Sequence, residues 1–476
     1  MINRQVLRGG WRTGALVVAA AMGAALLSAA PAVAVHGAVP GDFNGDGYRD
    51  AVLSASGANV AGKAGAGAVV VLYGSKSGLS ASRRAIVTQN TAGIPGTAEP
   101  YDGFGGATAT ADLNRDGYAD LVVSAPYEDT ARGRDAGEVT VLWGSKKGLT
   151  SGTDLPESAA GGGYYGLDVA ALSTGTGAKT EVLVAGYGGS MRFTGPFSSR
   201  GTYGAAVQNQ DTPSVGSVAL GDFDRDGFPD EVAVTLRLSD LSGGEVYVDP
   251  AIDGAQQKGN GLIAATGDIN GDGYADLVAG DPDEPHKAGA DGATGGRVLV
   301  WYGSAHGIAR DARPVQLTQN TSGVPGASEK GDGFGGALAV ADLNRDGLAD
   351  IVIGAPHEDT GKTDAGQVTV VPGRRAGALG GGAYAFTQDT AHVPGASEIE
   401  DNFGTTVAVG DISKDGRPEL FVSSAAEDNY TGAVWVFPGG TAGPTGKGSR
   451  MFTAPSVGLP QKDSTRLGGS GLLGVI

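Results

Sequence analysis

Short apolar runs separated by Gly-rich polar segments recur along the chain, and they return in a fixed order. A first run precedes an acidic segment, a second follows it directly, and a third and a weaker fourth come later. First runs are 103–111, 214–221, 259–267, 333–341 and 402–410; second runs include 119–126 and 349–356; third runs include 137–144, 296–303 and 432–439; fourth runs include 83–90 and 312–320. Short apolar runs bounded by turn residues are typical of buried strands. The order therefore predicts an all-β fold built from repeated four-stranded meanders.

The acidic segment between the first and second runs is itself a nine-residue repeat. It carries oxygen-bearing side chains at positions 1, 3, 5 and 9 and glycine at position 6. The six copies are DFNGDGYRD (42–50), DLNRDGYAD (112–120), DFDRDGFPD (222–230), DINGDGYAD (268–276), DLNRDGLAD (342–350) and DISKDGRPE (411–419). An EF-hand would need Glu at position 12, where this chain has apolar residues such as Leu53 and Val123. The repeat is therefore predicted to be a strand–loop–strand unit.

These loops are predicted to bind up to six Ca²⁺ ions. Alternating oxygen side chains, a glycine that permits a sharp turn and a backbone carbonyl at position 7 suit a hard cation. The alternative is an ion-free acidic turn, but three or more carboxylates in one loop repel one another unless a cation neutralises them. The candidate ligands, with position 7 contributing its carbonyl, are Asp42, Asn44, Asp46, Tyr48, Asp50, Asp112, Asn114, Asp116, Tyr118, Asp120, Asp222, Asp224, Asp226, Phe228, Asp230, Asp268, Asn270, Asp272, Tyr274, Asp276, Asp342, Asn344, Asp346, Leu348, Asp350, Asp411, Ser413, Asp415, Arg417 and Glu419.

The spacing of the repeats predicts seven units closed into a ring. The stretch 164–186 fits the repeat without its acidic ligands, with Glu181 alone near a ligand position. The loop at 42 has no predicted strand before it, and RLGGSGLLGVI (466–476) aligns with the first strand of other units. Residues Leu467–Ile476 are therefore predicted to complete the first blade of a seven-bladed propeller, which removes exposed sheet edges. An open solenoid, the alternative, would carry polar capping repeats.

The repeats also resemble a known family. GFGG…SAP (103–126) and GFGG…GAP (333–356), each flanking a D-x-N-x-D-G-x-x-D loop, resemble the FG-GAP repeats of the integrin α-subunit propeller and of bacterial secreted FG-GAP (VCBS-type) proteins. The resemblance implies a seven-bladed propeller with Ca²⁺ between the first two strands of blades. In integrins these ions lie on the face opposite the ligand-binding surface. The unit at 164–186 and the Ser413 and Glu419 substitutions depart from that pattern.

The N-terminal segment and the charge balance indicate an exported protein. Arg4, Arg8 and Arg12 precede an apolar run that ends in the cleavage pattern Ala32-Val33-Ala34, so residues 1–34 are predicted as a signal peptide and 35–476 as the propeller. An uncleaved membrane anchor is the alternative. The net charge is −18, and 19 of the 52 acidic side chains lie in the six loops. This acidity argues against nucleic acid as a partner, and the absence of cysteine excludes thiol chemistry.

The sequence gives only weak evidence for catalytic residues. The pairs Glu128-Asp129, Glu358-Asp359 and Glu427-Asp428 occupy the same place in three units, whereas a catalytic pair would break the symmetry at one site. The five histidines (His36, His286, His306, His357 and His392) show no metal-ligand spacing.

Long connectors are concentrated in units five, six, seven, one and two, which form one continuous arc of the ring. We expect any ligand site on this arc, because binding residues usually lie on loops held by a rigid scaffold. The exposed candidates there are Tyr101, Tyr127, Arg132, Arg134, His357 and Lys362. The predicted protein is a secreted, monomeric, calcium-binding adhesion or ligand-binding module for an extracellular protein or glycan, and not an enzyme. The alternatives are a carbohydrate-active propeller (a lectin or polysaccharide lyase) and a structural cell-wall protein.

Overall fold

The computed structural model describes residues 39–157, 162–173, 179–210, 212, 214–237, 242–249, 255–285, 287, 289–461 and 464–471. The predicted signal peptide, His36 and His286 lie outside these residues. In the described part of the chain, no helix is both long enough and apolar enough to span a bilayer.

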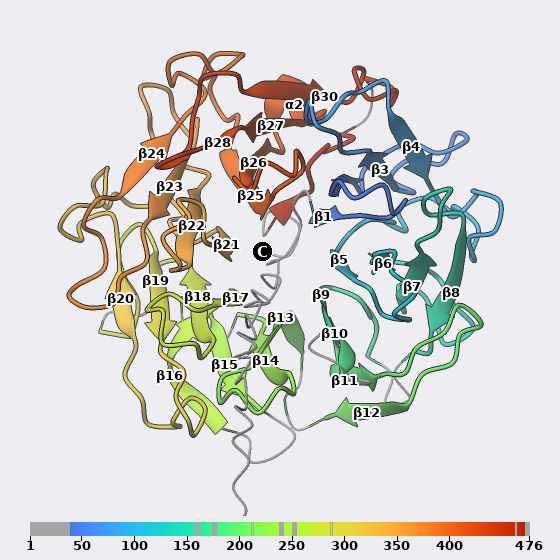
Figure 1. Cartoon of the computed structure of the whole chain (residues 1–476), viewed down its shortest axis with the longest axis horizontal. Coiled ribbons are helices and arrows are strands. Elements are labelled where there is room, and N and C mark those ends of the chain that lie inside the picture. Colours follow the sequence, from blue (N-terminus) through green and yellow to red (C-terminus); the bar gives the residue numbers. More distant parts are fainter. Residues whose placement is uncertain are drawn as a thin grey trace, which may run out of the picture. The chain divides into compact units, whose positions relative to one another are not determined.

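Seven four-stranded antiparallel sheets form the blades of a propeller (Figure 1). Blades one to three are β1 (Val39–Gly41), β2 (Asp50–Ala55), β3 (Ala68–Leu72) and β4 (Arg84–Val87); β5 (Thr108–Ala111), β6 (Asp120–Ala125), β7 (Glu138–Trp143) and β8 (Ser151–Leu155); β9 (Val169–Ser173), β10 (Thr180–Gly186), β11 (Gly189–Thr194) and β12 (Ala205–Asn209). Blades four and five are β13 (Val215–Gly221), β14 (Asp230–Thr235), β15 (Gly244–Val248) and β16 (Ala255–Gly261); β17 (Ile263–Gly267), β18 (Asp276–Asp281), β19 (Arg297–Trp301) and β20 (Val315–Leu317). Blades six and seven are β21 (Ala337–Ala341), β22 (Asp350–Ala355), β23 (Gln367–Val371) and β24 (Tyr384–Phe386); β25 (Phe403–Gly410), β26 (Glu419–Ser424), β27 (Ala433–Phe437) and β30 (Arg450–Thr453). Blade seven also carries the turn α2 (Glu427–Tyr430) and the small hairpin β28 (Gly439–Gly440) and β29 (Gly443–Pro444).

The hydrophobic core lies between consecutive blades. Seven clusters of buried side chains each combine residues of two neighbouring blades, including one cluster shared by blades seven and one. Because both faces of a blade are covered by neighbours, the second strands β2, β6, β22 and β26 are buried along their whole length. This explains why the second runs of the sequence are continuously apolar instead of alternating.

The C-terminal segment closes the ring, although not as a full strand. Leu467 is fully buried, and its N–H donates to the Thr431 carbonyl at 2.9 Å, as the Phe104 N–H does to Ala66 at the joint between blades one and two. The Gly468 N–H donates to Ser54 at the end of β2. Closure of the ring by this segment is therefore confirmed at the positions equivalent to GFGG, but the four strands of blade one are β1 to β4, and no strand is assigned within residues 464–471.

Two details of the prediction are wrong, namely the missing first strand of blade one and the single strand at 259–267, and a third stays a prediction. The loop at 42 does have a strand before it, because β1 pairs with β2 through Val39–Val52, Pro40–Ala51 and Gly41–Asp50. The last part of the predicted closing strand, 472–476, lies outside the described residues. The run 259–267 is not one strand: β16 ends at Gly261 as the outer strand of blade four, and β17 begins blade five at Ile263.

Candidate functional site

The six acidic loops share one set of internal hydrogen bonds. The position 6 glycine N–H donates to the position 1 aspartate at 2.8–3.1 Å in every loop. The position 7 N–H donates to the position 5 aspartate at 2.7–3.0 Å. Each position 6 glycine has a positive φ, from 78° in Gly416 to 91° in Gly117, which explains why only glycine occurs there. The loop conformation is thus encoded within nine residues.

The acid at position 9 is buried in five loops and half-buried in the loop of blade four (Asp230), and it ties each loop to its blade. It accepts the position 2 N–H at 2.6–3.0 Å in all six loops. In four loops its second oxygen accepts the N–H of the glycine after the third strand, at 2.9–3.1 Å. The position 2 residues are the buried anchors Phe43, Leu113, Phe223, Ile269, Leu343 and Ile412. Position 9 therefore joins the loop, the second strand and the end of the third strand.

Burial raises the pKa values of these position 9 acids. It raises the pKa of Asp50 to about 7, and the carboxylates of Asp42 and Asp46 add to the rise although two backbone N–H donors oppose it. Burial likewise raises the pKa of Asp120 and Asp276 to about 7. A neighbouring cation would oppose this shift, since an opposite charge favours the ionised carboxylate.

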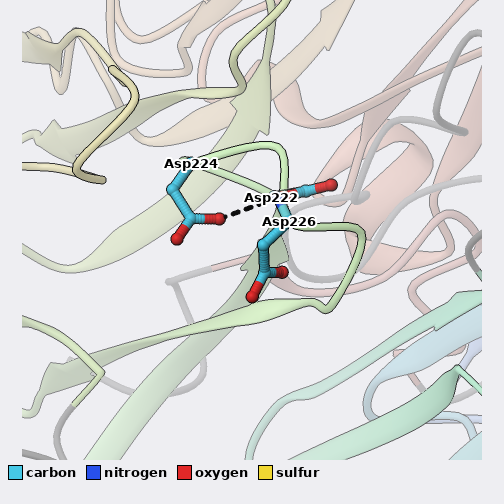
Figure 2. Close-up of side chains that lie close together, drawn as sticks. All are labelled: Asp222, Asp224 and Asp226. Atoms are coloured by element: carbon cyan, nitrogen blue, oxygen red, sulfur yellow. Dashed lines mark hydrogen bonds between the residues drawn. The ribbon is translucent and has the colours of Figure 1, made fainter.

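The loop of blade four brings three carboxylates closest together. One ligand oxygen from each of Asp222, Asp224 and Asp226 lies within 4.8 Å of the others (Figure 2). The Asp226 N–H donates to Asp224 Oδ1 at 2.9 Å, which fixes the turn. Asp222 Oδ1 is buried and accepts no hydrogen bond. A buried carboxylate oxygen without a donor is costly, and a hard cation at this loop would supply its missing partner. The donor set therefore fits Ca²⁺.

Some neighbouring loops are linked directly. The position 1 carbonyl of one loop accepts the position 8 N–H of the next: Asp42 from Ala119, Asp222 from Ala275 and Asp268 from Ala349, at 2.8–3.1 Å. Between the loops of blades four and five there is also a cation–π contact, with the guanidinium of Arg225 at position 4 lying 5.4 Å from the ring centre of Tyr274. These contacts connect the loops of blades one and two, and those of blades four, five and six.

Blade three departs from this pattern, as the sequence predicts. Residues 174–178, where its loop would lie, are outside the described residues, and Glu181 occupies the place of the position 9 acid. Burial raises the pKa of Glu181 to about 7, while the nearby Arg192 opposes the rise. Lys179 donates to the Asp226 carbonyl at 3.3 Å and stacks 3.7 Å over the Phe228 ring. A lysine thus faces the blade-four loop where other blades present an acidic loop.

The repeated Glu-Asp pairs act in blade joints. Gln89 in the connector after β4 donates to Glu128 at 2.7 Å, and Gln388 donates to Glu427 at 2.7 Å. Gln319 and Glu358 make the same contact. The threefold repetition supports a structural role for these pairs instead of a catalytic one.

The arc candidates from the sequence do not form one cluster. Tyr101 is 71% exposed, Arg132 pairs with Glu157 at 3.2 Å, and the exposed Arg134 lies 3.5 Å from Asp135. Lys362 is exposed. Tyr127 is half-buried, with its ring edge-on to Tyr164 at 5.7 Å. Of the six, His357 alone lines the described cavity below.

His357 belongs to a polar cavity of about 390 Å³ between blades six and seven and the C-terminal segment. Its other polar lining residues are Asp364, Glu400, Asn402, Tyr430, Arg466 and Ser470. Sequence reasoning missed these residues because they come from four segments far apart in the chain. A signal was present: Glu400 and Asn402 stand where the connector of blade six has Gly331 and Gly333.

Comparison with known proteins agrees with this geometry. The FG-GAP repeat family matches residues 34–72, 104–142, 260–301, 334–371 and 403–437, which fall on blades one, two, five, six and seven. The phosphatidylinositol-glycan-specific phospholipase D of Mus musculus is 33% identical over 165 residues, covering 34% of this chain and 18% of that protein. Integrin alpha pat-2 of Caenorhabditis briggsae is 32% identical over 208 residues (42% and 15%), and integrin alpha-7 of Homo sapiens is 31% identical over 134 residues (27% and 10%).

A ring of seven four-stranded blades with repeated FG-type joints defines a β-propeller. The chain is an FG-GAP repeat protein of the integrin-α-like kind. It spans less than a fifth of the length of these relatives. The likeness to bacterial VCBS-type proteins stays a prediction.

Proposed function

We propose that the chain is a secreted, monomeric, calcium-binding propeller that acts as an adhesion or ligand-binding module and not as an enzyme. The observation that carries the calcium proposal is the sixfold repetition of one loop geometry, together with the orphaned Asp222 oxygen. In each loop, positions 1, 3, 5 and 9 and the position 7 carbonyl would hold the ion, giving up to six ions. A bound ion would supply charge neutralisation among the carboxylates.

The calcium proposal is tested by thermal unfolding and calorimetry. The melting temperature should rise when Ca²⁺ is added to chelator-treated protein, and titration calorimetry should count several sites per chain. Extracellular Ca²⁺ modules bind at about 10⁻⁴–10⁻³ M, so the titration should cover that range. An unchanged melting temperature together with no heat of binding would contradict the proposal.

The ligand-binding proposal places the partner, an extracellular protein or a glycan, on the arc of blades five, six, seven, one and two. These are the blades that match the FG-GAP family, and they carry the long loops between second and third strands. Replacing 126–136 and 356–365 by short turns should abolish capture of partners from the native extracellular fluid. The melting temperature in Ca²⁺ should stay nearly unchanged when the short turns keep Glu128 and Glu358, because the rest of these loops lies outside the strand ladders and the blade joints. Retained capture would contradict this placement.

The second candidate is a carbohydrate-active propeller, and the polar cavity around His357 favours it. A lectin would bind glycans without consuming them, whereas a polysaccharide lyase would release unsaturated uronates that absorb ultraviolet light. A glycan array combined with that absorbance assay separates the two. The phospholipase activity in the name of the phospholipase D relative is not proposed for this chain, because the match covers 18% of that protein.

A further inference from the structure

The cavity around His357, which we name the blade-seven cavity, is assembled from four segments. His357 and Asp364 come from the loop between β22 and β23, and Glu400 and Asn402 come from the connector that leads into β25. Tyr430 ends α2, and Arg466 begins the C-terminal segment. The volume of about 390 Å³ lies within the range of small-molecule sites.

The backbone around this cavity is held in a conformation that L-residues rarely adopt. Asp364, Glu400, Asn402, Tyr430 and Arg466 all have φ between 51° and 64°. Non-glycine residues with positive φ are uncommon, and strained residues gather at ligand sites.

The same two connector positions in blade six show what the fold alone needs. Gly331 and Gly333 have φ of 96° and 71° at the places of Glu400 and Asn402. Glycine therefore satisfies the backbone, and the side chains of Glu400 and Asn402 are additional to it. The presence of these two larger side chains where glycine would suffice indicates that they have a role in the cavity.

Hydrogen bonds hold the Asn402 side chain in place. Asn402 Nδ2 donates to the Pro356 carbonyl at 3.3 Å and to the Asp364 carbonyl at 3.2 Å, and carbonyls accept only, so its amide orientation is fixed. The same nitrogen lies 3.2 Å from His357 Nδ1, so its two hydrogens face three acceptors around it. Burial lowers the pKa of His357, although Asp364 opposes the shift, which favours a neutral ring.

The backbone of the lining residues is also anchored. The Glu400 N–H donates to Thr363 at 2.9 Å, the Asn402 N–H to Asp364 at 3.0 Å and the Arg466 N–H to Tyr430 at 3.0 Å. A site whose donors and acceptors are already positioned loses little entropy on binding.

The lining chemistry narrows the ligand class. Seven of the eight lining residues are polar, the exception being Ala425, so an apolar ligand would leave polar groups unpaired. Asp364 and Glu400 are acceptors, while Arg466 is a donor. Two carboxylates disfavour a phosphate or other polyanion, and the guanidinium disfavours a cation. A neutral molecule with many hydroxyl groups fits this mixture, because each hydroxyl both donates and accepts.

An aromatic ring at the cavity completes the case. Tyr430 is 44% exposed and lines it directly. Aromatic faces can cover the C–H side of a sugar ring.

We propose that the blade-seven cavity binds a neutral sugar residue, with Glu400 and Arg466 hydrogen-bonded to its hydroxyls and Tyr430 against its ring. This assignment deepens the proposed ligand-binding function and rests on it.

Saturation-transfer NMR of the full chain in Ca²⁺, with glucose, galactose, mannose and N-acetylglucosamine as probes, tests the assignment. At least one sugar should bind, and E400G and R466Q should each weaken it about tenfold or more. The matched control is Y101G, because Tyr101 has φ of 73° at the equivalent connector position of blade two. E400G and Y101G each introduce the residue that blade six carries at this position, so both should keep the wild-type melting temperature, and Y101G should also keep sugar binding.

The outcomes separate the two proposals. No binding of any probe, or undiminished binding by E400G and R466Q, overturns the sugar site. Equal loss in Y101G overturns it as well. If partner capture from extracellular fluid survives while all four sugars fail, the ligand-binding function stands and this assignment falls.

Discussion

At the residue scale, the acidic loops show how far a local pattern determines geometry. Positions 1, 5 and 6 are close in sequence, and their hydrogen bonds repeat in all six loops. The spacing of oxygens and the glycine could therefore be predicted from sequence. The double role of position 9 could not, because its second donor, such as Gly303 for Asp276, comes from another strand.

The loop of blade five allows two aspartates to be compared. In chelator at pH 8, Asp276→Asn should lower the free energy of unfolding by about 1–3 kcal/mol, since an amide leaves one of two buried N–H donors facing an NH₂ group. Asp272→Asn is the control, because Asp272 is exposed and Asn keeps the oxygen that accepts the Tyr274 N–H. Its change in chelator should stay within about 0.5 kcal/mol. Urea unfolding measures the free energy of unfolding of both variants. Equal losses in the two variants would contradict the role of position 9 in joining the loop to the second and third strands.

At the element scale, strands were predictable and their ends were less so. The second and third runs became the buried strands, because a blade packed on both faces demands apolar residues throughout. The break at Leu262 between β16 and β17 was missed, since both flanking segments carry similar small residues and the division depends on which blade each joins. The joints between blades are also where half-buried acids meet connectors, as in the contact of Gln388 with Glu427.

This joint makes stability depend on pH. Burial raises the pKa of Glu427 from 4.5 to about 7, so between these values the unfolded chain ionises while the folded chain keeps its proton. Stability should therefore fall as pH rises from about 4.5 to about 7. Glu427→Gln removes this contribution, and the loss of unfolding free energy between pH 5 and pH 8 in chelator should become smaller.

Asp428→Asn is the control for that experiment, because Asp428 is exposed beside the same joint. Its pH profile should follow the wild type. An unchanged profile in Glu427→Gln, measured by denaturant unfolding at each pH, would show that Glu427 does not govern the pH dependence of stability in this range.

At the scale of the whole molecule, ring closure was predictable in outline. The likeness of RLGG to GFGG identified the segment that meets blade one, and Leu467 takes the place of the buried phenylalanines. The blade-seven cavity was beyond sequence reasoning, because its walls come from four separate segments between His357 and Ser470 that meet only in the folded ring.

The joint between blades seven and one should be sensitive to shortening of a single side chain. Leu467→Ala should cost about 2–5 kcal/mol of unfolding free energy, because Leu467 is fully buried in the cluster shared by blades seven and one. Val315→Ala on β20 is the control, since Val315 is 37% exposed. Equal unfolding midpoints for the two variants would argue against closure through Leu467.

Six of the seven joints are also crossed by a connector that runs directly into the next blade's first strand, whereas β1 and the segment around Leu467 meet without such a covalent link. A stretching force applied across the propeller would thus open this seam first. Tyr430 and Arg466 of the blade-seven cavity both lie on the blade-seven side of this seam. An occupant held by both residues would fasten the C-terminal segment to blade seven, so an optical-trap measurement should record a higher force for detaching that segment when the occupant is present.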